Sequence, residues 1–293
     1  MKREVTPPKV IVEACIGCER CIAVCPSYVL EMVKTKANVT RGEWCIGCGH
    51  CGAVCPSEAI LHEAVSFEKY PKEGRASMIS PEILERLLRE RRSIRNYHPD
   101  PLSEEILKKV LDAGRHAPTG SNSQNVHYVV ITSPDRIAQL REMTIKFYDK
   151  IFSRMGGRLG RFFLSLIAGR KTVEYLSESI PKARIAYEQM RQGKDRLFYH
   201  APVVILTHAE SWDSCSSFNC SVALYHCSLM AHTLSLGCCF NGILVNAENH
   251  HQKIKGWLGI PSDHQCYAAM TLGYPDMQYP RLIQRHPPKA RWR

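Results

Sequence analysis

The hydrophobic pattern in the second half of the chain predicts two amphipathic helices in succession. The first begins at Ser80, which is suited to an N-cap, with Pro81 at the first helical position. It ends near the polar, basic segment 91–97, and the second helix runs from Ser103 to Gly114. The apolar positions that share one face are Ile83, Leu84, Leu87 and Leu88 in the first helix and Ile106, Leu107, Val110 and Leu111 in the second.

Apolar runs further along the chain predict buried strands at residues 125–133, 201–209 and 264–275. A third helix starts at residue 134, after the first of these strands. Residues 219–236 form a largely apolar helix, which we expect to be buried. Helices and strands alternate without regular βαβ repetition, so the predicted fold class is α+β.

The first 60 residues show a different pattern, a repeated cysteine motif. CIGCERCIAVCP begins at Cys15 and CIGCGHCGAVCP at Cys45, and each copy reads C-x2-C-x2-C-x3-C-P. In the bacterial two-cluster arrangement the fourth cysteine of each copy ligates the other cluster. The predicted ligands are therefore Cys15, Cys18, Cys21 and Cys55 for one [4Fe–4S] cluster and Cys45, Cys48, Cys51 and Cys25 for the second.

A structural zinc site or a disulfide framework would be the alternative use of paired cysteines. Zinc takes four ligands, and eight regularly spaced cysteines followed by prolines fit it poorly. Disulfides need an oxidising compartment, whereas the sequence shows no signal peptide and we expect a reducing, cytoplasmic location. Residues 8–68 resemble a bacterial ferredoxin with two [4Fe–4S] clusters.

Composition refines the domain organisation. The repeat requires at least two domains, expected at 1–70 and 80–293, and the polar segment 71–79 reads as their linker. The formal net charge of +11 lies entirely after residue 70, because residues 1–70 balance eight basic against eight acidic side chains. Each oxidised cluster would add about −2 to the first domain. A basic second domain would attract anionic ligands.

Two classes of partner are not expected. No helix-turn-helix, zinc-finger or RNA-binding signature accompanies the basic charge, so a nucleic-acid partner is not predicted. No apolar run reaches the length of a membrane span, and the nearest, FFLSLIAG at 162–169, is far too short.

Two further motifs resemble the paired fingerprints of the nitroreductase family of FMN-dependent enzymes. They are RRSIRNY at 91–97 and APTGSNSQN at 117–125, and the turn LGCCFNGIL at 236–244 and the C-terminal LGYPD…YPRLIQR fit the same order. The resemblance spans about residues 80–285. It implies a central mixed sheet flanked by helices, and fusions with a ferredoxin module form a recognisable subgroup of this family.

The resemblance also implies which residues bind FMN. Arginine suits a phosphate and the carbonyl edge of a flavin through its forked donors. Members of the family bind FMN as homodimers, and the second motif reaches the flavin held mainly by the partner subunit. The implied cofactor-binding residues are Arg91, Arg92, Ser93 and Arg95 in the first motif, Pro118, Thr119, Gly120, Asn122 and Gln124 in the second, Asn241 and Gly242 beside the flavin N5, and Arg281 and Arg285 near the phosphate.

Plainer interpretations remain open for several of these stretches. The segment 91–95 alone could be a basic, solvated helix end, and 118–124 a simple turn. Phe240 stands where many members of the family have tryptophan. Residues 151–200 could form a lid over the active site or a solvated helical hairpin.

Cysteine and histidine residues outside the motifs have plain interpretations too. We expect Cys220 and Cys227 in the core and His250 and His251 at the surface. The adjacent pair Cys238 and Cys239 sits at the flavin turn, where a redox role is the less favoured alternative to a packing role.

Together these motifs predict an FMN-dependent oxidoreductase of the nitroreductase type. Single electrons would enter through two [4Fe–4S] clusters, and FMN would deliver them in pairs to a small organic acceptor. A ferredoxin, which gives one electron at a time, and NAD(P)H, which gives a hydride, are the two possible donors. The alternative is an electron-transfer adaptor that serves a protein partner and has no organic substrate of its own. The sequence assigns no catalytic proton donor.

Overall fold

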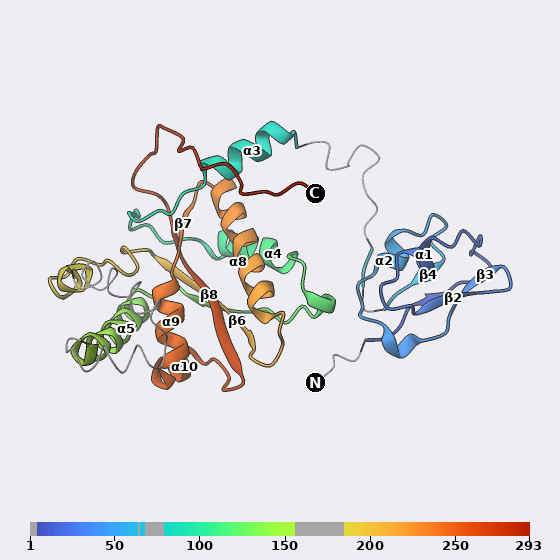
Figure 1. The fold of residues 1–293 in the computed structure, drawn as a ribbon, viewed down its shortest axis with the longest axis horizontal. Helices are drawn as coiled ribbons and strands as arrows, with labels where there is room; N and C mark the ends of the chain where they lie inside the picture. The colour runs from blue at the N-terminus through green and yellow to red at the C-terminus, as the bar shows by residue number, and fades with distance from the viewer. Residues whose placement is uncertain (1–4, 64, 68–78, 156–184) are drawn as a thin grey trace. The chain divides into compact units, whose positions relative to one another are not determined.

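The computed structural model describes residues 5–63, 65–67, 79–155 and 185–293 (Figure 1). Contacts divide the chain into two compact units, one of residues 1–80 with 119–124 and one of residues 81–118 with 125–293. Nearly all of the predicted linker at 71–79, and most of the segment considered as a lid at 151–200, lie outside the described residues. Each unit is described by itself below.

The first unit is built from two short helices and two pairs of short antiparallel strands. The helices, one in each copy of the cysteine repeat, contact each other: α1 (Arg20–Ala23) and α2 (His50–Ala53). The strands pair as β1 (Lys9–Val10) with β4 (Ile60–Leu61) and β2 (Leu30–Val33) with β3 (Lys36–Val39). The core between these elements contains Cys15, Cys21 and Cys51 among its buried residues.

A glycine in each repeat permits the tight path of the chain between cysteines. Gly17 and Gly47 have φ angles of 71° and 65°, in the left-handed region that favours glycine. A Cβ atom on Gly17 would also lie 2.5 Å from the carbonyl oxygen of Thr35. The cysteine loops therefore depend on glycine at these positions.

The second unit is organised around a four-stranded sheet in the order β5-β6-β8-β7. Its strands, all paired antiparallel, are β5 (His127–Ile131), β6 (Val203–Glu210), β7 (Gly237–Phe240) and β8 (His264–Gly273). A parallel bridge between Ser93 and Cys238 adds a further segment beside β7 and makes the pairing mixed. The predicted α+β class is confirmed, while the predicted mixed character of the sheet is limited, among the described residues, to this isolated bridge.

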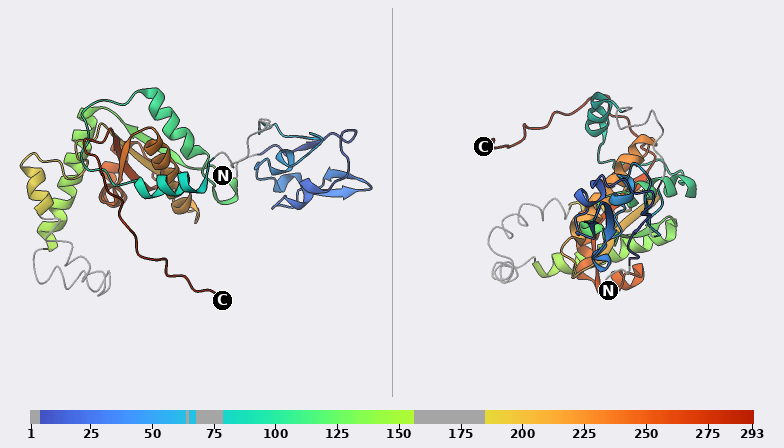
Figure 2. Two further views of the ribbon diagram at one scale, coloured as in Figure 1. Left: turned by 90° about the horizontal axis from the view of Figure 1, so that it is seen from above. Right: turned by 90° about the vertical axis from the view of Figure 1, so that its right-hand side faces the viewer.

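Helices cover both faces of this sheet (Figures 1 and 2). On one face α4 (Glu104–Arg115) and α8 (Ser216–Thr233) share a core with alternate strand residues such as Val203 and Ile205. On the other face α5 (Pro134–Met155), α9 (Gly242–His250) and α10 (Gln252–Leu258) pack against Val204 and Leu206. The fully buried strand residues explain the continuous apolar runs seen in the sequence.

The helix α3 (Pro81–Glu90) forms where the pattern predicts it, but none of its residues is buried. Its apolar face is open in one chain, with Ile83 61% and Leu84 48% exposed. The sequence pattern missed β7, α9 and α10, since 236–244 read only as a turn. Among the described residues no helix is long and apolar enough to cross a membrane.

Candidate functional site

The first flavin motif is an extended segment held between two parts of the sheet. At its start, Ile94 N donates to Cys238 O of β7 (2.9 Å), next to the Ser93–Cys238 bridge. This close approach requires Gly237, because a Cβ atom there would lie 2.4 Å from Ile94 Cγ1. The path of the motif is therefore fixed by a glycine in β7.

The end of the motif is held by the segment that follows β8. His98 N donates to Tyr274 O (2.9 Å), and the Tyr97 hydroxyl forms a 2.7 Å hydrogen bond with Thr271 Oγ1. Ile94 and Tyr97 are buried, so the motif is anchored through these two side chains. Tyr97 is a positioning residue that the sequence comparison with the family motif did not single out.

The arginines of this motif have unused donors. Arg91 Nε and Arg92 Nε are buried and have no hydrogen-bond partner in the part of the chain that the structure describes. An unpaired buried donor is costly, which makes these atoms candidates for a ligand that accepts hydrogen bonds. Arg92 also donates from Nη2 to Arg281 O (3.3 Å), which brings one of the predicted C-terminal arginines to the motif.

A cavity of about 740 Å³ opens beside these arginines. Its lining includes five arginines and three glutamates, so the charged groups leave a net positive site. The arginines are Arg86, Arg89, Arg91, Arg92 and Arg281, and Gly237 and Cys238 of β7 form part of the wall. Size and charge suit an anionic cofactor such as a phosphate ester. Arg285 is exposed and is not part of this wall.

The two adjacent thiols beside the motif are neutral at physiological pH. Burial raises the pKa of Cys238 to about 11, and the nearby Arg91 guanidinium only partly offsets it. Burial also raises the pKa of Cys239, against the opposing effects of Arg95 and Ser93. A protonated, buried thiol is a poor nucleophile, so the geometry favours a packing role for both.

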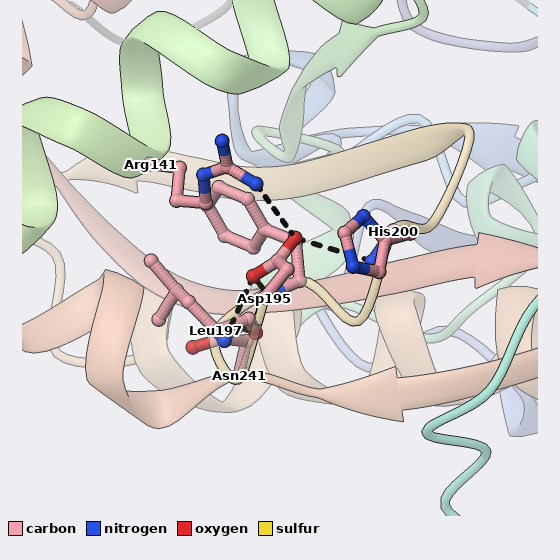
Figure 3. A network of polar contacts seen from close by, with 6 residues as sticks. Arg141, Asp195, Leu197, His200 and Asn241 are labelled. Atoms are coloured by element: carbon pink, nitrogen blue, oxygen red, sulfur yellow. Dashed lines mark hydrogen bonds and ion pairs between the residues drawn. The ribbon is translucent and has the colours of Figure 1, made fainter. Parts of the chain in front are cut away.

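Asn241 is fixed by a network of polar contacts at the start of α9 (Figure 3). Its Nδ2 donates to Leu197 O (2.7 Å) and its Oδ1 accepts from Leu244 N (2.9 Å), which caps the helix. Its backbone N–H donates to Ala269 O of β8 (2.8 Å). The polar side-chain atoms and the amide of Asn241 are therefore used by the fold.

The turn that supplies Leu197 O is organised by a buried carboxylate. Asp195 accepts hydrogen bonds from the backbone N–H groups of Leu197, Phe198 and His200 at 2.9–3.1 Å. Arg141 Nη1 of α5 approaches the same carboxylate at 3.6 Å. Figure 3 shows this carboxylate between the arginine and the turn. No sequence motif marks Asp195 or Arg141, because their role depends on contacts across the fold.

Of the two residues predicted to lie beside the flavin N5, Asn241 and Gly242, only Gly242 is accessible to a ligand. It is exposed and occupies the first position of α9, where backbone N–H groups have no partner within the helix. No Cβ contact restricts the space around it. A backbone donor at a helix N-terminus suits an electron-rich atom of a ligand.

The second flavin motif is a strained loop, η3 (Gly120–Asn122) with its flanks. Ser121, Asn122 and Gln124 all have positive φ angles. Thr119 stabilises the loop, since its Oγ1 accepts from Gln124 N and its carbonyl from Asn122 N, both at 3.0 Å. Residues 119–124 group with the first unit, where Asn122 Nδ2 donates to Ile46 O (3.0 Å), whereas Pro118 groups with the second. Such backbone strain is typical of ligand-binding loops.

The cysteines of the repeat gather in the crossed pattern. Burial raises the pKa of Cys21, and the thiolates of Cys15 and Cys55 raise it further by repulsion. Burial likewise raises the pKa of Cys51 to about 11, with repulsion from Cys48, Cys45 and Cys25. Cys25, Cys45, Cys48 and Cys51 also line one small cavity. Cys55 thus lies near Cys15 and Cys21 of the first copy, and Cys25 near Cys45, Cys48 and Cys51 of the second.

Hydrogen bonds to the two crossing sulfurs follow the same symmetry. Cys25 Sγ accepts from Val29 N (3.4 Å), and Cys55 Sγ accepts from Ala59 N (3.2 Å). Such bonds tune the potential of an iron–sulfur cluster. Bound iron would also supply the positive charge that keeps these thiols deprotonated. The residues present fit two four-iron clusters.

Comparisons with known proteins match both units of the chain. Residues 8–56 match the family model of a 4Fe-4S dicluster domain, and residues 88–274 match that of the nitroreductase family. Iodotyrosine deiodinase 1 of Rattus norvegicus is 24% identical over 74% of this chain and 70% of its own. The 4-nitrobenzoate reductase of a Nocardioides species is 25% identical over 68% of this chain and 83% of its own.

The solved structures give the same fold. An iodotyrosine deiodinase bound to FMN and 3-iodo-L-tyrosine superposes with a TM-score of 0.52 at 19% identity, over 72% of this chain and 98% of that one. This similarity supports the fold of the second unit and nothing finer. Because the matching family model spans more than half of the chain, the protein belongs to the nitroreductase family.

Proposed function

We propose that this member of the nitroreductase family is an FMN-dependent oxidoreductase that receives electrons one at a time through two [4Fe–4S] clusters and passes them in pairs to a small organic acceptor. The observation that carries the flavin part is a pair of buried donors, Arg91 Nε and Arg92 Nε, which have no partner among the described residues and lie beside a positively charged cavity. The clusters transfer single electrons, and FMN accepts single electrons and releases a pair.

The residues of the second unit would hold FMN through charge and backbone donors. Arg91, Arg92 and Arg281 line the cavity and would supply the positive charge that a phosphate needs. Ser93, whose side chain hydrogen-bonds Cys239, is proposed to bind FMN from the same motif. Arg95 is exposed beyond the buried Ile94 and is available to the pyrimidine edge of the flavin. The exposed Gly242 at the start of α9 offers its amide to the reactive N5.

The crossed cysteine sets are proposed as the ligands of the clusters. Cys15, Cys18, Cys21 and Cys55 would bind one cluster, and Cys45, Cys48, Cys51 and Cys25 the other. Apolar neighbours such as Val29 and Ile60 exclude water from one side of these sulfurs. Limited solvent access and sulfur hydrogen bonds are the means by which this unit sets the cluster potential.

The active form is proposed to be a homodimer with FMN at the subunit interface. The open apolar face of α3 is one support, because such a face on a soluble helix normally packs against another surface. Leu282 and Ile283 in the segment after β8 are exposed as well. The loop 118–124 would complete the flavin site of the partner subunit. Light scattering should show a dimer whenever flavin is bound, and a flavin-loaded monomer would contradict this arrangement.

Turnover of a small acceptor tests the proposed function against the adaptor alternative. The purified dimer is supplied anaerobically with a reduced low-potential ferredoxin or with NAD(P)H and with a nitroaromatic acid as acceptor. We expect the acceptor to be consumed with an even number of electrons per molecule, and an Arg91→Met variant to be impaired in proportion to its flavin content. Flavin-loaded protein that oxidises the donor only when a second protein is added would support the adaptor instead.

A further inference from the structure

A group of imidazole and carboxylate side chains gathers at one end of the sheet, outside the candidate flavin site. His127 of β5, Glu210 of β6 and His264 of β8 each offer a ligand atom, and these atoms all lie within 4.8 Å of one another. We propose that this trio is a binding site for a divalent transition metal of the zinc class.

The strand register explains why these side chains meet. His127 pairs directly with His208 across β5 and β6, and Glu210 pairs directly with His264 across β6 and β8. Because side chains alternate along a strand, His208 and Glu210 point to the same face. Three strands therefore deliver four polar side chains to one corner of the sheet, on the side covered by α9 and α10.

The spacing of the rings suits a shared metal ion. The ring centroids of His127 and His264 are 5.0 Å apart, in an edge-to-face arrangement. Two imidazoles on one tetrahedral zinc, with Zn–N bonds of about 2.1 Å, place their ring centroids roughly 5 Å apart. Their ligand atoms would be about 3.4 Å apart, so a modest side-chain rotation closes the site. His127 is exposed and Glu210 half-buried, so both can make this movement.

Neighbouring polar groups already orient the proposed ligands. A 2.9 Å hydrogen bond joins Nδ1 of the buried His208 to Nδ1 of His264 and fixes the ring of the latter. Asn125 Nδ2 donates to Glu210 Oε2 at 2.9 Å and to Asp213 Oδ2 at 3.0 Å. Contacts of this kind orient the ligands in metal sites and are a recurring feature of them. Asp213 adds negative charge nearby, whereas Lys255, which donates to the carbonyl of His264, adds positive charge.

The ligand types select the metal. Two imidazole nitrogens and one carboxylate oxygen suit zinc and its neighbours in the Irving–Williams order, whereas magnesium and calcium prefer sites made of oxygen alone. Three protein ligands leave one coordination position open to solvent, on the side of the exposed His127. The site is distinct from the thiolate sites of the cysteine repeat.

The location points to a stabilising role for the metal. Thr271, which pairs with Cys239 near the flavin motif, lies roughly 23 Å along β8 from His264, at about 3.3 Å per residue. The proposed metal is therefore remote from the proposed flavin. Asn125 and His127 instead follow directly on the loop 118–124, so a metal here would fasten the base of that loop to the ends of β6 and β8.

Zinc binding to the full-length protein with its clusters intact tests the proposal. The protein is dialysed into zinc-free buffer and then equilibrated with micromolar Zn²⁺, and zinc and iron are measured together by mass spectrometry. We expect one zinc per chain with unchanged iron. His127→Ala and Glu210→Gln should each weaken zinc binding at least tenfold, since each removes a ligand. His250→Ala, at an exposed position of α9, is the matched control and should bind zinc as the wild type does.

The thermal stability of the protein and its selectivity among metals provide further tests of the zinc site. Zinc should raise the thermal unfolding midpoint of the wild type but not of His127→Ala, whose side chain is exposed and can be truncated without opening the core. Mg²⁺ should neither bind nor stabilise, whereas Ni²⁺ should do both. Equal zinc binding by wild type and both ligand variants, loss of iron in step with zinc uptake, or equal binding of Mg²⁺ would each overturn the proposal.

Discussion

Replacement of Arg91 by methionine should weaken FMN binding and at the same time stabilise the flavin-free protein. Methionine removes the charge and all donors of the guanidinium but keeps a long apolar stem against the wall of the cavity. The two effects have opposite signs because Arg91 Nε is a buried donor without a partner among the described residues. A residue with a purely structural role would not show this combination.

The magnitudes follow from the geometry of this donor. A hydrogen bond from a charged donor to a phosphate or carbonyl oxygen contributes about 1.5–3 kcal/mol, so its loss should raise the Kd of FMN about 10- to 150-fold. In the flavin-free protein the same substitution removes the penalty of an unsatisfied buried N–H, which is about 1–3 kcal/mol. Loss of the contact with Cys238 offsets part of this gain, so we expect a stabilisation of about 1 kcal/mol.

The assay is a fluorescence titration of deflavinated protein with FMN, together with urea unfolding of the flavin-free form. Iron content, measured on the same samples, should not change. Arg115→Met is the control, since Arg115 is 70% exposed and forms an ion pair with Asp112 on the surface of α4. An unchanged Kd for FMN combined with lower stability of Arg91→Met would show that Arg91 serves the fold rather than the flavin.

Other predictions concern the cysteines and the Asp195 turn. Cys55→Ala should remove about four of about eight iron atoms and leave intact the cluster that Cys51 would bind, which electron paramagnetic resonance of the remaining cluster can establish. Loss of the Cys51 cluster alone would contradict the crossed arrangement. Asp195→Ala should lower the free energy of unfolding, measured in urea, by about 3 kcal/mol or more, because it leaves three N–H groups without their acceptor at about 1–3 kcal/mol each. Arg141→Gln should cost less than about 1 kcal/mol, since its pair is distant and partly exposed. Cys238 should resist alkylation at pH 7.5, because its pKa of about 11 keeps it protonated until the pH approaches that value; rapid modification detected by peptide mass spectrometry would argue for a reactive thiol.

The grouping of the repeat cysteines is the part of the proposed site for which the sequence makes the most specific prediction. Their spacing, C-x2-C-x2-C-x3-C-P, is local, and a local spacing survives in any fold that forms the loop. The strands at 201–209 and 264–275 were also predictable, because they are buried on both faces and read as continuous apolar runs. The start of helix α4 was predictable from its N-cap, Ser103, whose side chain accepts a hydrogen bond from Ile106 N.

Features that depend on contacts between residues far apart in the sequence could not be predicted from local patterns. The strand β7 is only four residues long, and it is stabilised by its pairing with β8 and its bridge to Ser93 rather than by a pattern of its own. The role of Asp195 arises from backbone groups that meet only in the folded turn. The histidines at the sheet corner lie more than 50 residues apart, and each alone looks like an ordinary strand residue.

If the clusters carry electrons to the flavin, removal of the cysteine repeat should stop flavin reduction by a one-electron donor. Stopped-flow absorbance follows flavin reduction by the same reduced low-potential ferredoxin in the full-length protein and in a chain that begins at Ser77. Both are first shown to bind FMN equally and to be reduced fully by dithionite. We expect rapid flavin bleaching in the full-length protein and little or none in the shortened chain. Equal rates in the two would contradict this expectation and would leave the cysteine repeat with a structural role.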